Sequence, residues 1–200
     1  STYVIPGQSA TLGRALLIST DGITWRESIA GAGAIGVTLR GAAASSSALV
    51  AVGTSGTVLH SLDGTRWTAR ASGTTTQLND VAFGAGRFVA VGNAGTILSS
   101  ADGTTWSRQT APANVTLNGV HFANGLWVIA AASGRIFTSA NGLDWTQRYN
   151  GPTSAGFNRA TFGHGLFVAV GNAGALLTSP DGAAWAPAAT LTTENLNDVV

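Results

Sequence analysis

The sequence predicts an all-β fold built from five repeats of a four-stranded unit. Three observations carry this prediction: a recurring motif, short apolar segments bounded by turn residues, and chain ends that complement each other. The motif has the pattern Ser-x-(Asp/Asn)-Gly-x-x-Trp, and its five copies are Ser19–Trp25, Ser61–Trp67, Ser100–Trp106, Ser139–Trp145 and Ser179–Trp185. Successive tryptophans are 42, 39, 39 and 40 residues apart, and a nearly constant period in this range indicates a repeat architecture.

The third repeat shows the strands of one unit. Residues 78–110 contain the segments LNDVAFG, RFVAVG, TILSSA and TTWSRQT, separated by Gly with Asn, Ala or Asp. Such short segments, rich in β-branched and aromatic residues, predict four strands with three tight connections. The Asp102-Gly103 pair predicts a two-residue hairpin with positive φ at both positions. Four antiparallel strands per repeat of this length are typical of a β-propeller blade, so the sequence predicts a five-bladed β-propeller.

The two chain ends predict how the ring closes. Thr2–Gly7 aligns with the second strand of the other repeats, whereas Leu196–Val200 aligns with the first strand. We therefore expect the C-terminal strand to complete the first blade, which covers open sheet edges. The predicted blades of this single domain, residues 1–200, are residues 196–200 with 1–31, 34–73, 78–111, 117–150 and 157–190.

The composition excludes several classes of function. Only 10% of residues are charged and the formal net charge is +1, against about 25% charged residues in an ordinary domain. Without a basic or acidic tract, neither nucleic acid nor an anionic membrane surface is an expected partner. No apolar segment approaches the roughly 18 residues of a membrane span. A Gly-, Thr-, Ser- and Asn-rich chain without lysine favours a secreted protein, extracellular or periplasmic.

The repeated motif resembles the Asp-box, or BNR repeat. The whole unit is similar to the WD40/YVTN/BNR-like repeats of secreted bacterial β-propellers, over essentially all 200 residues, although the box here is one residue shorter between Asp and Trp. The resemblance implies a structural role for the box residues, in which the carboxylate caps the turn and the tryptophan wedges between neighbouring sheets. These residues are Asp21, Trp25, Asp63, Trp67, Asp102, Trp106, Asn141, Trp145, Asp181 and Trp185.

The alternative roles for the box are sugar stacking by its tryptophans and calcium binding by its carboxylates. Calcium requires six or more oxygen ligands, and each box supplies one carboxylate or none. The structural role is therefore the favoured interpretation.

The side chains that catalysis requires are not grouped in the sequence. Asp80 and Asp198 fall at equivalent first-strand positions, but of blades that are not adjacent, whereas a glycosidase needs two facing carboxylates. His60, His121 and His164 do not recur at one strand position, and the chain has no cysteine, so no metal site is predicted. We expect a non-enzymatic protein without a cofactor, and an enzyme of the sialidase or glycosidase kind is the least favoured hypothesis.

One repeated polar feature suits a ligand. Asparagine follows the first residue of the first strand in four blades, and the loops after the second strands add two more; this predicted ligand-binding set is Asn79, Asn118, Asn158, Asn197, Asn93 and Asn172. In the second blade the first strand is expected to begin at Ile35. Amides both donate and accept hydrogen bonds, as sugar hydroxyls require. The alternative is that these side chains cap turns between blades.

The fourth blade departs most from the repeat and supplies a predicted partner patch, Trp127, Arg135, Asp144, Arg148 and Tyr149. Tryptophan, tyrosine and arginine are common interface anchors. The first functional hypothesis is a secreted carbohydrate-binding module whose repeats gain avidity on a glycan. The alternative is a structural, assembly or protein-interaction propeller of a cell-surface or extracellular complex.

Overall fold

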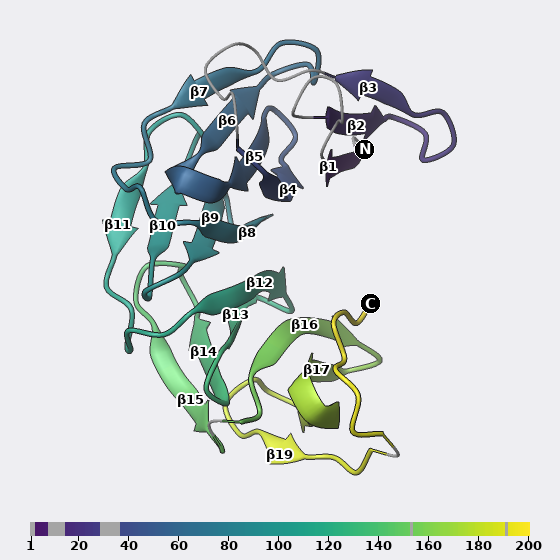
Figure 1. Cartoon of the computed structure of the whole chain (residues 1–200), viewed down its shortest axis with the longest axis vertical. Coiled ribbons are helices and arrows are strands. Elements are labelled where there is room, and N and C mark those ends of the chain that lie inside the picture. Colours follow the sequence, from purple (N-terminus) through teal and green to yellow (C-terminus); the bar gives the residue numbers. More distant parts are fainter. Residues whose placement is uncertain (1–2, 8–14, 29–36, 153, 191) are drawn as a thin grey trace. The chain divides into compact units, whose positions relative to one another are not determined.

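The computed structural model describes residues 3–7, 15–28, 37–152, 154–190 and 192–200 of the chain. Over these residues it contains five antiparallel sheets, four with four strands and one with three (Figure 1). The predicted all-β propeller class, with five blades, is confirmed. In the described part of the chain, no helix is long and apolar enough to cross a membrane.

The chain divides into two compact units. The first contains Ser1–Ala90 and Leu98–Arg108, and the second contains Val91–Ile97 and Gln109–Val200. The boundary therefore passes through the third sheet.

The first two sheets belong to the first unit. The first sheet has the order β1-β2-β3, with β1 (Tyr3–Gly7), β2 (Ala15–Ser19) and β3 (Arg26–Ser28). The second has the order β4-β5-β6-β7, with β4 (Leu39–Ala44), β5 (Leu49–Gly53), β6 (Val58–Ser61) and β7 (Thr68–Arg70).

The remaining sheets repeat the same up-and-down order, in which each strand pairs with the next along the chain. The third sheet has β8 (Leu78–Gly84), β9 (Arg87–Gly92), β10 (Ile97–Ser100) and β11 (Ser107–Gln109). The fourth has β12 (Leu117–Ala123), β13 (Leu126–Ala131), β14 (Arg135–Ser139) and β15 (Thr146–Asn150). The fifth has β16 (Phe157–Gly163), β17 (Leu166–Gly171), β18 (Leu176–Ser179) and β19 (Ala186–Pro187).

Pairs of successive residues with positive φ lie at connections other than Asp102-Gly103. Two successive residues with positive φ join the first and second strands of the third, fourth and fifth sheets, at Ala85-Gly86, Asn124-Gly125 and His164-Gly165. In the Asp102-Gly103 pair only the glycine has positive φ, +76°, so the prediction of a two-residue hairpin there is wrong. The physical reason is that the aspartate side chain closes the turn by hydrogen bonds, which removes the need for a left-handed residue at its own position.

The first strand of the second sheet begins later than predicted. Leu39 pairs with Gly53 as Leu117 pairs with Ala131, so Arg40 holds the position that Asn118 holds in the fourth sheet. Ile35, the predicted start, lies outside the described residues. The position of this strand was not predicted correctly because four of its six residues are Gly or Ala. A Cβ on Gly41 would lie 2.8 Å from the Asp80 Cα, so a close approach to the neighbouring strand requires glycine there.

The core of the first unit fills the spaces between its sheets. Side chains of the first sheet, Leu16 and Ile18, pack with Leu49, Leu59 and Trp67 of the second. A second cluster joins the other face of the second sheet to the third and combines Val50, Val58, Phe88, Leu98 and Trp106. In both clusters the box tryptophan of one sheet packs on the sheet that precedes it, as the resemblance implies.

The core of the second unit follows the same rule. Val128 and Ile136 of the fourth sheet pack with Phe157, Phe167 and Trp185 of the fifth. The first two strands of the third, fourth and fifth sheets also share an aromatic pair with ring centroids 4.6–4.9 Å apart, namely Phe83–Phe88, Phe122–Trp127 and Phe162–Phe167. Such tilted pairs add stabilisation beyond the area they bury.

The first sheet exposes the side chains that the other sheets bury. Tyr3 and Trp25 are 49% and 37% exposed, and their rings lie 6.4 Å apart. Leu17 between them is 40% exposed. The corresponding side chains of the third sheet, Phe88, Leu98 and Trp106, pack on the second sheet. Tyr3, Leu17 and Trp25 thus form an exposed set of apolar side chains on the first sheet.

The C-terminal segment behaves as the start of a further first strand, although it forms no strand in the described residues. The Leu196 N–H donates to the Gly171 carbonyl at 2.9 Å. The Asn158 side chain donates to the Leu196 carbonyl at 3.0 Å, just as the Asn118 side chain donates to Phe157 at 2.7 Å. Completion of the first sheet by residues 196–200 involves both units and stays a prediction.

Deletion of residues 196–200 tests that prediction. If the segment pairs with β1, the β1 amides that do not bond to β2 are protected from hydrogen exchange, and the deletion removes their protection. Amides of β9 serve as the internal control and should keep theirs. Equal exchange of the β1 amides in both proteins would contradict closure by this segment.

Candidate functional site

The polar groups of the box are used within its own turn. In the third box, the Ser100 hydroxyl donates to the Asp102 carboxylate at 3.0 Å and accepts the Gly103 N–H at 2.8 Å. The same carboxylate oxygen of Asp102 accepts the N–H groups of Thr104 and Thr105 at 2.8 and 3.0 Å. In the fourth box the amide oxygen of Asn141 replaces the carboxylate.

These hydrogen bonds keep the box carboxylates ionised. The Thr104 hydroxyl and then the N–H groups of Thr105 and Thr104 hold the pKa of Asp102 well below its usual range. At Asp21 the N–H groups of Thr24 and Ile23 lower the pKa in the same way. A carboxyl group with so low a pKa does not deliver a proton near neutral pH. Within the described ranges, no group of three or more His, Cys, Asp or Glu is placed to hold a metal ion.

The box tryptophans are also satisfied locally. The indole N–H of Trp106 donates to Gly103 at 3.1 Å and that of Trp185 to Gly182 at 2.9 Å. Trp67 donates to Gly64 and to the Ser28 hydroxyl of the preceding sheet. Trp145 differs, because its indole nitrogen is buried without a hydrogen-bond partner among the described residues. The fourth box therefore departs from the pattern of the second, third and fifth boxes.

The predicted asparagine set links neighbouring sheets. Asn118 and Asn158 donate to carbonyl groups of the segment that follows one repeat later, and Asn158 also donates to Asn172 at 3.1 Å. Asn79 is 9% exposed and accepts a hydrogen bond from Gln77. These contacts favour the alternative in which the amides connect blades. Binding of a ligand by this set, with Asn93 and Asn197, stays a prediction.

The predicted patch of the fourth sheet is not one surface. Trp127 is fully buried, so its assignment to a partner surface is wrong. Its ring packs against that of Phe122 on the neighbouring strand. The apolar pattern of the sequence does not show whether a strand residue is buried between sheets or exposed at an edge. Tyr149 packs edge-on against Phe157. Arg148 is exposed and its Nε donates to the Thr138 hydroxyl at 3.0 Å.

The other two patch residues occupy different surroundings. Arg135 is half-buried, and its Nε has no hydrogen-bond partner in the part of the chain that the structure describes. Asp144 is exposed, and the Asn141 side chain donates to its carboxylate at 2.8 Å.

Asp80 and Asp198, the two carboxylates predicted at equivalent first-strand positions, differ in burial and in hydrogen bonding. Asp198 approaches Arg159 of β16 at 3.8 Å, with 70% of the aspartate side chain exposed, and an exposed pair of this kind contributes little to stability. Asp80 is 7% exposed and accepts the N–H of Val81 at 2.9 Å. Asp80 belongs to the first unit and Asp198 to the second.

A pocket of about 300 Å³ adjoins the fourth box. It is lined by Gln109, Thr110, Pro112, Leu143, Asp144 and Trp145. We call it the fourth-box pocket. Sequence reasoning named two residues of this set, Asp144 in the partner patch and Trp145 as a structural residue of the box. The missed signal is that Leu143-Asp144 replaces Ala183-Ala184 of the fifth box and Thr104-Thr105 of the third. The fourth box therefore carries larger side chains at these two positions, and its carboxylate lies next to the tryptophan.

Comparison with known proteins supports the fold. Residues 61–157 match a family described as the DUF6242 beta propeller domain. No curated protein matches the sequence. A structure of YCF48 bound to D1 peptide is similar, with a TM-score of 0.65 and 17% identity over 86% of this chain and 59% of that one. The chain thus spans less than two thirds of that YCF48 chain.

Two enzymes share the fold. Virginiamycin B lyase from Staphylococcus aureus has a TM-score of 0.74 at 11% identity, over 96% of this chain and 75% of that one. The GH74 enzyme of Niastella koreensis has a TM-score of 0.62 at 17% identity, over 92% of this chain and 30% of that one. Likeness at these identities shows the β-propeller fold alone, and this fold occurs in enzymes as well as in YCF48.

The box turn predicts a defined response to acid. The pKa of Asp102 is lower in the folded state than in the unfolded state, so its ionised form stabilises the fold. This contribution to the unfolding free energy is complete above about pH 4 and is lost as the pH falls below that value. Asp102→Asn, which copies Asn141 of the fourth box, should therefore reduce the loss of unfolding free energy between neutral pH and pH 3. Urea denaturation at several pH values measures it.

Two further variants sharpen that test. Ser100→Ala should lower the unfolding free energy at neutral pH by about 1 kcal/mol, because it removes a buried hydrogen-bond pair. Glu27→Gln removes an exposed carboxylate outside the boxes and is the control. If Asp102→Asn leaves the acid dependence of stability unchanged, the carboxylate does not act as described.

The role of the asparagine set is tested at Asn118. Asn118→Ala should lower the unfolding free energy by about 1 kcal/mol, because the Phe157 carbonyl loses its donor. Thermal or urea denaturation measures the change, with the exposed Asn150→Ala as the control. An unchanged stability would contradict the linking role.

Proposed function

We propose that the chain is a non-enzymatic binding propeller that recognises an extended polypeptide segment of a partner protein in the fourth-box pocket. The observation that carries the proposal is the composition of this pocket. It joins an aromatic and apolar surface, from Trp145, Leu143 and Pro112, to polar groups of Gln109 and Asp144.

This combination matches the chemistry of a peptide. An extended peptide offers apolar side chains together with backbone N–H and C=O groups, and the glutamine amide both donates and accepts. The Asp144 carboxylate adds an acceptor for a backbone N–H or a basic side chain. Aromatic side chains in such pockets often dominate the binding energy.

The similarity to YCF48 supports the same proposal. That protein has been solved with D1 peptide bound, which is an example of peptide recognition on this fold. The similarity extends to 86% of this chain. The partner of the present chain is inferred from its pocket and not from the identity of that peptide.

A carbohydrate is the second candidate ligand, and Trp145 favours it. An indole ring beside an amide and a carboxylate also suits a sugar, which stacks its apolar face and hydrogen-bonds its hydroxyls. A carbohydrate ligand agrees with the prediction that the protein is a secreted binding module of the extracellular space or periplasm. Both candidate ligands are assigned to the same pocket, so binding experiments must distinguish between them.

Selection from a random peptide display library, followed by calorimetry with the selected peptide, tests the proposal. Asp144→Ala should weaken the dissociation constant at least tenfold, about 1.4 kcal/mol. Thr105→Ala changes the same position of the third box and should leave affinity unchanged. Failure to select any peptide, or equal binding by Asp144→Ala, would overturn peptide recognition at this pocket.

A glycan array provides the second arm. Binding of a neutral glycan that Asp144→Ala abolishes, with no peptide selected, would replace the peptide with the carbohydrate candidate. Turnover of a bound glycoside would contradict the non-enzymatic part of the proposal.

A further inference from the structure

The outer strands of the second and fourth sheets carry an arginine at the same distance from the box tryptophan, Arg70 and Arg148. In the fourth sheet the Nε of Arg148 donates to the Thr138 hydroxyl at 3.0 Å. In the second sheet His60 stands at the position of Thr138. The Nε of Arg70 is buried and has no hydrogen-bond partner among the described residues. A buried donor without an acceptor is costly.

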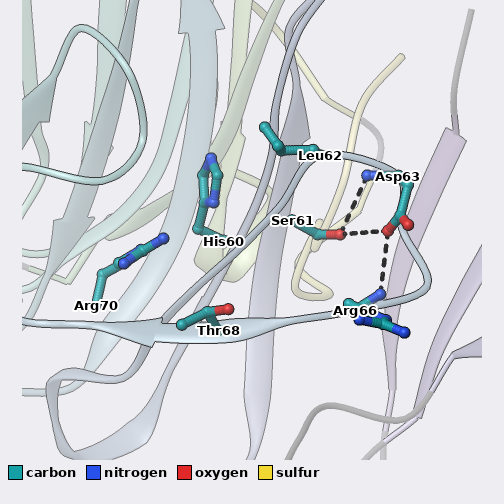
Figure 2. A pocket seen from close by; sticks show the side chains of 7 residues that line it. All are labelled: His60, Ser61, Leu62, Asp63, Arg66, Thr68 and Arg70. Carbon is teal, nitrogen blue, oxygen red and sulfur yellow. Dashed lines mark hydrogen bonds between the residues drawn. The ribbon is translucent and has the colours of Figure 1, made fainter.

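The Arg70 side chain also lines a pocket of about 240 Å³ in the first unit. Figure 2 shows the Arg70 side chain extending toward the imidazole of His60, with Thr68 on the same strand as Arg70, β7. Arg66 lines the pocket from the box turn. His60 is only 6% exposed. We call this space the second-sheet pocket.

The one carboxylate that lines the pocket is already engaged. The Asp63 carboxylate accepts hydrogen bonds from the Ser61 hydroxyl and from the N–H groups of Thr65 and Arg66. The Thr65 hydroxyl donates to its second oxygen. Two guanidinium groups therefore share the pocket with a carboxylate that is directed to its own turn, as Figure 2 shows for its bonds to Ser61 and Arg66.

We propose that the second-sheet pocket binds a single oxyanion, either a carboxylate or a phosphate group. Arg70 supplies charge-assisted hydrogen bonds, and Thr68 and His60 supply further donors. Arg66 adds positive charge at the box-turn end of the pocket. A guanidinium fork fits both oxyanions. The bound group gives the Arg70 guanidinium an acceptor, as Thr138 does for the Nε of Arg148 in the fourth sheet. This site shares no lining residue with the fourth-box pocket, so its failure leaves the proposed function untouched.

His60 provides a reporter inside the pocket. Burial and then the nearby Arg70 lower its pKa, whereas Asp102 of the adjacent box raises it. An oxyanion bound beside Arg70 offsets the arginine charge and so raises the pKa of His60. His121 lies on β12, and burial alone lowers its pKa. It is the internal control, because no part of the second-sheet pocket contacts it.

Acetate and inorganic phosphate are the probes, titrated separately into the whole protein at constant ionic strength set by chloride. We expect saturable shifts of the His60 ring resonances in the NMR spectrum, and a raised pKa of His60 at saturating acetate, with His121 unchanged. Tighter binding of acetate identifies a carboxylate ligand, and tighter binding of phosphate identifies a phosphate ligand. No saturable shift with either probe at millimolar concentration would overturn the proposal.

Three variants test the geometry by calorimetry. Arg70→Gln should weaken binding of the preferred probe at least tenfold. His60→Thr rebuilds the arginine–threonine pair of the fourth sheet and should weaken binding without loss of the folded state, which circular dichroism verifies. Arg148→Gln removes the matched arginine and should leave binding unchanged. Equal weakening by Arg148→Gln would show nonspecific charge screening and overturn the site.

Discussion

The packing of each sheet on the sheet that precedes it is the interaction on which the rest of the structure depends. A three- or four-stranded sheet of this size cannot bury its own faces, so the box tryptophan and the aromatic residue of the second strand must pack on a neighbour. Trp67, Trp106 and Trp185 do so. Trp25 and Tyr3 of the first sheet, by contrast, remain substantially exposed.

This constraint decides where function can lie. The repeated polar residues are used to make blades: box carboxylates close turns, and Asn118 and Asn158 join neighbouring sheets. What remains for recognition are the positions at which repeats differ. Leu143-Asp144 in the fourth box and His60 with Arg70 in the second sheet are such positions, and each borders a pocket.

Sequence reasoning succeeded where the physics is local. The strands of the third repeat and the capped box turns follow from alternating apolar residues and turn chemistry within a few residues. It failed at β4, because a strand of Gly and Ala lacks an apolar signature. It also failed at Trp127, whose complete burial depends on how sheets pack and not on the local pattern.

The sequence by itself determined the repeat, the five-bladed β-propeller class and the role of the box in its own turn. These depend on a period near 40 residues and on hydrogen bonds between residues two or three apart. Only the tertiary structure decided that Asn118 binds the carbonyl of Phe157 and that the Nε of Arg70 lacks the acceptor that Arg148 has. Those outcomes depend on which groups meet across strands and sheets, where partners lie up to a full repeat away along the chain.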